Sequence, residues 1–156
     1  MSWKFNEVRP VLISDGLHPT ESTHCSYGKV STSPQIPITE DELERNVAAY
    51  YIYGTNEGEA LLLELTLGKS NQEFLAKAET NFKQLVSKLF LAVTQQKMPA
   101  EWDLTADTVT NCAGFLIKCV ENQKSSPSTV NVLIAHRDEL QKGLDIRQKF
   151  LYSTTA

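Results

Sequence analysis

Residues 70–98 read SNQEFLAKAETNFKQLVSKLFLAVTQQKM and carry the clearest structural signal in this sequence. Ser70 is followed three residues later by Glu73, the spacing of a capping box, in which both side chains bond free amides at a helix start. Apolar residues then recur at intervals of three and four, as on the buried face of an amphipathic helix. We therefore predict a central helix over residues 70–98, ended by Pro99.

Three further stretches have patterns that we interpret as helical. A second capping box at residues 39–42 precedes a periodic apolar run, and Gly54 is a typical residue after a helix end. Residues 105–122 place apolar side chains at a period of 3.6 residues. Residues 127–151 do the same after a Ser-Pro break, which is a common helix start. These stretches add three helices to the central one.

Residues 59–67, EALLLELTL, fit two interpretations. Every second residue from Leu61 to Leu67 is leucine, as in a strand, whereas Ala, Leu and Glu are strong helix formers. As a strand, the segment is the second arm of a β-hairpin that begins with residues 50–53. We predict a short helix and keep the hairpin as the alternative.

The first 37 residues differ from the rest of the chain. Four of the six prolines lie here, and no helical period runs through the segment. We therefore divide the chain into an extended N-terminal arm, residues 1–37, and a helical domain, residues 38–156. Trp3 and Phe5 are too apolar for a solvated tail, so part of the arm is expected to pack on the domain.

These patterns together predict an all-α fold of four to five helices packed around the central helix. The alternative is an α+β fold with a small sheet formed by the arm and residues 50–67. A length of 156 residues suits one domain with a core large enough to fold without disulfides or metal.

The composition limits the classes of partner. The net charge is −4, which gives no basic surface for a nucleic-acid backbone, and no apolar run is long enough to span a membrane. The first residues lack the pattern of a signal peptide, and three widely spaced cysteines fit free thiols in a reducing compartment. We expect a cytoplasmic protein that binds neither nucleic acid nor membrane.

Two local patterns suggest chemistry, and neither is complete. Gly68-Lys69-Ser70 resembles the end of a phosphate-binding loop, but the glycine required five residues earlier is Leu63, so no nucleotide is expected. His24 and Cys25 are adjacent in sequence, and His18 is nearby. A thiolate–imidazole pair depends on adjacency in space, which the sequence does not give. We therefore predict no catalytic residues, no metal site and no cofactor.

The leading functional hypothesis is a non-catalytic interaction protein: an adaptor, an assembly chaperone, an immunity or inhibitor protein, or a small subunit of a larger complex. Its partner is another protein or a second copy of the chain. The expected contact residues are aromatic, because aromatic side chains are enriched at interfaces: Tyr50, Tyr51, Tyr53, Trp3 and Phe5. This hypothesis predicts an exposed apolar patch centred on the tyrosines or on the arm.

Two alternatives belong to other classes. One is a small enzyme whose site gathers scattered residues, with His18, His24, Cys25 and His136 as the available acids, bases and nucleophiles. The other is a small-molecule binder with an apolar cavity of about 300 Å³ or more between helices.

Overall fold

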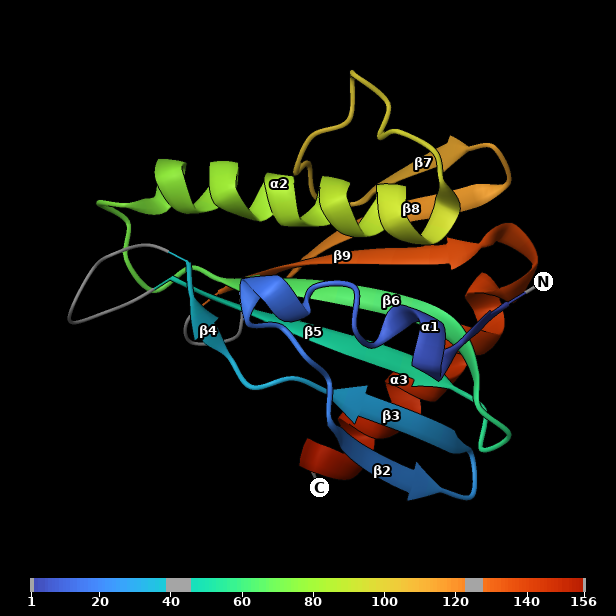
Figure 1. The fold of residues 1–156 in the computed structure, drawn as a ribbon. Helices are drawn as coiled ribbons and strands as arrows, with labels where there is room; N and C mark the ends of the chain where they lie inside the picture. Colours follow the sequence, from blue (N-terminus) through green and yellow to red (C-terminus); the bar gives the residue numbers. More distant parts are fainter. Residues whose placement is uncertain (1, 39–45, 123–127, 156) are drawn as a thin grey trace.

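The computed structural model of the protein describes residues 2–38, 46–122 and 128–155. Within these residues the chain forms one antiparallel sheet with a long helix on each face (Figure 1). The elements in chain order are β1 (Trp3–Lys4), α1 (Phe5–Val8), η1 (Ile13–Asp15), β2 (Glu21–Cys25), β3 (Gly28–Thr32), β4 (Ile36–Pro37), β5 (Val47–Gly54), β6 (Glu59–Gly68), α2 (Leu75–Thr94), β7 (Thr108–Cys112), β8 (Phe115–Asn122), β9 (Thr129–His136), η2 (Arg137–Glu139) and α3 (Leu140–Thr155).

The sheet has the strand order β2-β3-β5-β6-β9-β8-β7. The two shortest strands lie beside the central strands. β1 pairs with the start of β6, and β4 pairs with the start of β5. Strands β2 and β7 therefore lie at the two ends of the sheet that the described residues form.

The prediction of an all-α fold is wrong, and so is the helical bundle that it implies. The α+β alternative is closer, although the sheet is much larger than the one predicted. The helix predicted over residues 105–122 is replaced by the hairpin β7–β8, and the described residues of the helix predicted over 127–151 are divided between β9, η2 and α3. The predicted helix start at residues 39–42 lies outside the described residues.

The segment with two interpretations is a strand. Residues 59–68 form β6, which pairs with β5 from Val47 to Gly54, so the hairpin alternative is correct. Leu63, Leu65 and Leu67 alternate with polar residues, as in a strand, whereas residues 60–63 are continuously apolar because both faces of β6 are covered. Leu63, Leu65 and Leu67 point toward α2, whereas Leu62 points toward α3.

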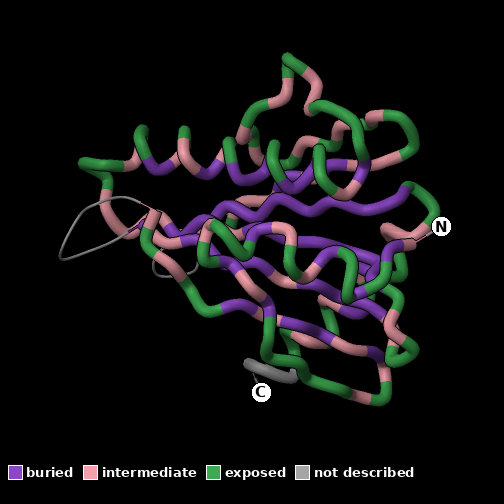
Figure 2. The backbone as a smooth tube through the Cα atoms, viewed as in Figure 1, coloured by how far each residue is buried: buried purple, intermediate pink, exposed green. Residues whose placement is uncertain are grey.

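A separate core lies on each face of the sheet. The larger one packs α2 and the N-terminal residues on β5, β6, β8 and β9, and the smaller one packs α3 on β3, β5, β6 and β9. Figure 2 shows the central strands as the buried layer between these two covers. Phe82, Val86 and Leu89 of α2 are fully buried, as the helical period predicts. The helix is shorter than predicted and spans Leu75–Thr94.

Residues 2–37 belong to the same sheet and core. They provide β2 and β3 at one end of the sheet, and Leu12 and Leu17 are fully buried in the larger core. Among the described residues, no helix combines the length and hydropathy needed to span a bilayer.

Candidate functional site

The aromatic residues expected at an interface lie mostly inside the protein. Tyr50, Tyr53, Trp3 and Phe5 are each 7% exposed or less, and Tyr51 is half-buried. The large apolar side chains that are exposed lie elsewhere, and in the described part of the chain they are Ile13, Phe74, Leu91, Val109, Leu151 and Tyr152. Any partner-binding surface on this structure must therefore be sought away from Tyr50, Tyr53, Trp3 and Phe5.

Polar atoms of these aromatic residues bond to other segments of the chain. The Tyr50 hydroxyl donates to the carbonyl oxygen of Val8 at 2.8 Å, and the Trp3 indole N–H donates to the carbonyl oxygen of Val93 at 2.9 Å. Both bonds tie the first residues of the chain to its main body. Burial raises the pKa of Tyr50 well above its usual value, as expected for a phenol that is removed from water.

The four candidate acids, bases and nucleophiles lie in separate places. His24 and Cys25 are consecutive residues of β2, so their side chains point to opposite faces of the strand. His24 Nδ1 lies 3.3 Å from Asn56 Oδ1. His18 lies just before β2. His136 is the last residue of β9, which is separated from β2 by β3, β5 and β6.

His136 is packed between two aromatic rings. The centroid of its ring lies 4.4 Å from that of Trp3 and 4.6 Å from that of Phe115. Burial lowers the pKa of His136, which favours a neutral imidazole in this aromatic stack. No set of three or more His, Cys, Asp or Glu side chains among the described residues is grouped to hold a metal ion.

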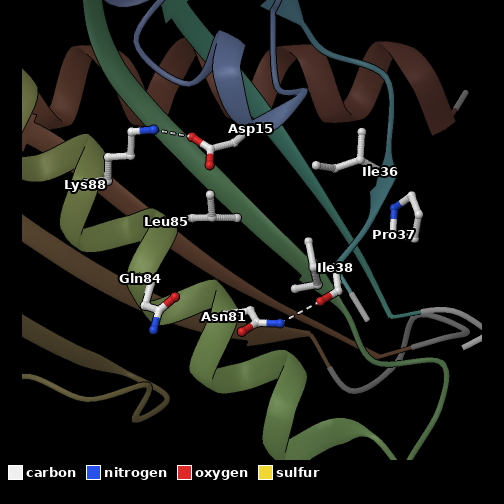
Figure 3. Close-up of a pocket in the computed structure, with 8 residues that line it drawn as sticks. All are labelled: Asp15, Ile36, Pro37, Ile38, Asn81, Gln84, Leu85 and Lys88. Carbon is white, nitrogen blue, oxygen red and sulfur yellow. Dashed lines mark hydrogen bonds and ion pairs between the residues drawn. The ribbon is translucent and has the colours of Figure 1, made fainter. Parts of the chain in front are cut away.

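A pocket of about 370 Å³ lies between α2 and the segment that carries β4 (Figure 3). Leu85 and Ile36 give it an apolar lining. At one end, Lys88 Nζ lies 2.6 Å from Asp15 Oδ2, so these two charges neutralise each other. At the other end, Asn81 of α2 donates to the carbonyl oxygen of Ile38 at 2.8 Å. The pocket is lined by none of the four candidate catalytic residues.

The end strand β7 presents a different kind of surface. It pairs with β8 on one side, and the described residues place no strand on the other side. The hairpin turn consists of Ala113 and Gly114, with φ of 52° and 88°, which are the signs of a type I′ turn. The flanking residues, Cys112 and Phe115, then form a hydrogen-bonded pair.

Alternation along the hairpin identifies the backbone groups at the free edge. Hydrogen-bonded and non-hydrogen-bonded pairs alternate in an antiparallel ladder, so the backbone groups of Cys112, Thr110 and Thr108 point toward β8. Those of Asn111 and Val109 point away from it. The edge thus offers two N–H groups and two carbonyl groups at the spacing that an added strand requires.

The side chains of β7 are suited to strand pairing. Its sequence is TVTNC, with three β-branched residues in succession and no charge. Val109 is 57% exposed and points to the same face of the sheet as Leu116 of β8. That face is covered by α3 at β3, β5, β6 and β9, so β7 lies beyond the strands on which α3 packs.

From the sequence, residues 105–122 are predicted to form one helix, so the β7 edge is not predicted. Two signals point the other way: the β-branched run Thr108-Val109-Thr110, and the Ala-Gly pair at 113–114, which a tight turn can use. That β7 is the last strand of the sheet depends on strand order, which is a tertiary property.

Comparison with known proteins gives no relative: no family model, no curated protein and no solved structure matches this chain.

Proposed function

We propose that this protein is a non-catalytic binding protein that takes up an extended segment of a protein partner as an added strand beside β7. The observation that supports the proposal is the unprotected edge of this strand. The backbone groups of Val109 and Asn111 face outward, and no charged side chain lies in the strand. Main-chain hydrogen bonds to an edge of this kind supply affinity in strand addition, and alternate side chains supply specificity.

Edge strands of proteins that do not bind at their edges are usually protected. Lysine, proline, a bulge or a very short strand prevents pairing with other chains. The opposite end of the sheet illustrates the difference, because β2 carries Glu21 and His24, both exposed. β7 has the same length but no such residue, so an added strand is more compatible with β7 than with β2.

The proposed partner segment is uncharged and has at least one β-branched or aromatic residue on the α3 side of the sheet. Such a side chain would contact Val109, which is 57% exposed, and cover part of its surface. Affinity from so small a surface is modest, and a dissociation constant in the micromolar range, about 1 to 100 μM, is expected.

The test uses peptides selected from a random ten-residue library against the folded protein. Val109→Pro removes the outward N–H group but leaves the ladder to β8, in which that group takes no part. We expect it to weaken binding of the selected peptides at least tenfold. The matched variant Val109→Thr keeps the N–H group and should change binding less than about threefold. Selected peptides that bind both variants equally would refute the proposal, provided that both variants unfold cooperatively.

A second candidate function is supported by the pocket between α2 and β4. Its volume of about 370 Å³ is within the range of small-molecule sites. Asp15 and Lys88 neutralise each other, so the suited ligand has an apolar body and a neutral polar end. Leu85→Trp, which fills the pocket, should abolish the chemical-shift changes that small apolar amides cause around Asn81. Unaltered shift changes in this variant would exclude the pocket as their origin.

We also propose a cytoplasmic location for this function. The three cysteines, Cys25, Cys112 and Cys119, are free thiols, which suits a reducing compartment. When cells are lysed under denaturing conditions with a thiol-blocking reagent, all three cysteines should carry the blocking group. A disulfide recovered from freshly lysed cells would argue against this location.

A further inference from the structure

We infer that the strand added beside β7 is β7 of a second copy of this chain, so that two sheets join into one across a two-fold axis. This inference rests on the proposed function, since it names the source of the added strand. It follows from the register, the side chains and the charges that two copies of the edge would bring together.

Full overlap of two antiparallel β7 strands places the axis at Thr110. Thr110 of one copy is opposite Thr110 of the other, and Val109 is opposite Asn111. Val109 and Asn111 are the residues whose backbone groups face outward, so each pair of them exchanges both hydrogen bonds. Registers displaced by two residues would bring Asp107 or Ala113 into the ladder, and both have positive φ. The full-overlap register is therefore the one that the backbone favours.

The side chains are compatible with this axis. The two Thr110 residues form a non-hydrogen-bonded pair, the position in which cross-strand side chains approach most closely, and Thr–Thr pairs are favourable there. β7 has no charged residue, so no like charges meet in the new ladder. Thr110 is also half-buried on the side of the sheet where Ile117 packs, which limits its freedom before association.

The joined edge is small compared with a permanent dimer interface, which usually buries more than about 1,000 Å². We therefore expect a reversible dimer, with a dissociation constant of about 10 to 100 μM. Sedimentation velocity over a concentration series from about 1 to 500 μM covers this range.

The decisive variants place charge on the axis. Thr110→Lys and Thr110→Glu each put two like charges directly opposite each other, so each should weaken self-association at least tenfold. A mixture of the two variants puts lysine opposite glutamate and should restore association to within about threefold of the natural chain. Thr23→Lys, at the centre of the opposite end strand β2 and exposed, is the matched control and should associate normally.

Three results would overturn the inference: a natural chain that stays monomeric at 500 μM, single-charge variants that still dimerise, or a mixture that remains monomeric. The mixture guards against misfolding, because two unfolded variants cannot restore a specific dimer. A monomeric chain that still binds selected peptides through Val109 would overturn the second copy as the strand source but leave the proposed function. If the natural chain neither self-associates nor binds selected peptides through Val109, both the dimer and the proposed function are refuted.

Discussion

Glu64 is the buried carboxylate that connects α3 to the sheet. It is 3% exposed, and Arg147 of α3 donates two hydrogen bonds to it, at 3.0 and 2.9 Å. The Tyr53 hydroxyl donates a third, at 2.6 Å. The bidentate geometry fixes how α3 is oriented on the sheet, and removal of one partner leaves a buried charge without compensation.

Arg147→Met is expected to lower the free energy of unfolding by about 3 to 5 kcal/mol, since Glu64 then remains buried without its partner. The double variant Glu64→Leu, Arg147→Met should recover most of this loss, because it removes both charges from the interior. Urea unfolding at pH 7 measures both values. A single variant within 1 kcal/mol of the natural chain would contradict the account of this pair.

The buried tyrosines make stability sensitive to alkaline pH. Burial raises the pKa of Tyr50 and of Tyr53, and the negative charge of Glu64 and its hydrogen bond raise that of Tyr53 further. A tyrosine in the unfolded chain loses its proton near pH 10. The unfolded state therefore binds fewer protons than the folded state above that pH. The contribution of these groups is complete below pH 10 and decreases as the pH rises beyond it.

Tyr50→Phe provides the corresponding test. Near pH 7 it should cost about 1 kcal/mol, for the lost hydrogen bond to Val8. Between pH 10 and 11 the free energy of unfolding should decrease less steeply than in the natural chain, because one group with a raised pKa is gone. Parallel slopes for the two proteins in this interval would exclude a buried, protonated Tyr50.

At the scale of elements, the β7–β8 hairpin contains a residue in an unfavourable conformation. Ala113 has φ of 52°, a region that costs residues other than Gly, Asn and Asp about 1 to 2 kcal/mol. Ala113→Gly or Ala113→Asn should therefore stabilise the protein by about 1 kcal/mol. Gly114→Ala should destabilise it by a similar amount, although a Cβ there meets no atom within 4 Å. Thermal unfolding that ranks these variants in the opposite order would contradict a type I′ turn.

The attachment of α3 depends on a close approach at Gly143. A Cβ on this residue would lie 2.6 Å from Leu62 Cβ, so the helix would have to move away from β6. Gly143→Ala is expected to cost about 1 to 3 kcal/mol, against the gain of up to about 1 kcal/mol that alanine gives in a helix interior. Gly58→Ala, at a turn position where φ is 95° and a Cβ meets no atom within 4 Å, measures the cost of a positive φ without a steric contact. A stabilised Gly143→Ala protein would mean that α3 does not pack this closely.

The elements also show what the sequence can predict. Helix α2 is predictable because its apolar period is repeated over Leu75–Thr94, long enough to distinguish 3.6 from 2 residues. β6 is ambiguous, because residues 63–67 alternate as in a strand while its Ala, Leu and Glu residues favour a helix. In residues 105–122, which contain β7 and β8, the apolar side chains match a helical period of 3.6 residues by coincidence. Gly114, which lies inside the helix predicted over residues 105–122, is half of a turn.

At the scale of the molecule, the sequence predicts a hydrophobic core, but it does not predict that the sheet divides this core into two. Two helices cover opposite faces of one sheet, and this arrangement buries Tyr50 toward α2 and Tyr53 toward α3. Three tyrosines lie within residues 50–53. This pattern fits a helix with one solvent-exposed side as well as it fits a central strand. That choice depends on strands far away in the sequence. The place of the candidate site does too, since the described residues pair β7 with β8 alone, at the end of the strand order.

The most direct measurement for the central claim is amide hydrogen exchange along β7, followed by NMR. In dilute protein, Thr110 and Cys112 should be protected by β8, whereas Val109 and Asn111 should exchange rapidly. At high protein concentration, or with a selected peptide, Val109 and Asn111 should become at least tenfold more protected, because an added strand bonds their amides. Two results would contradict the account: protection of all four amides in dilute protein, or rapid exchange of Val109 and Asn111 under every condition.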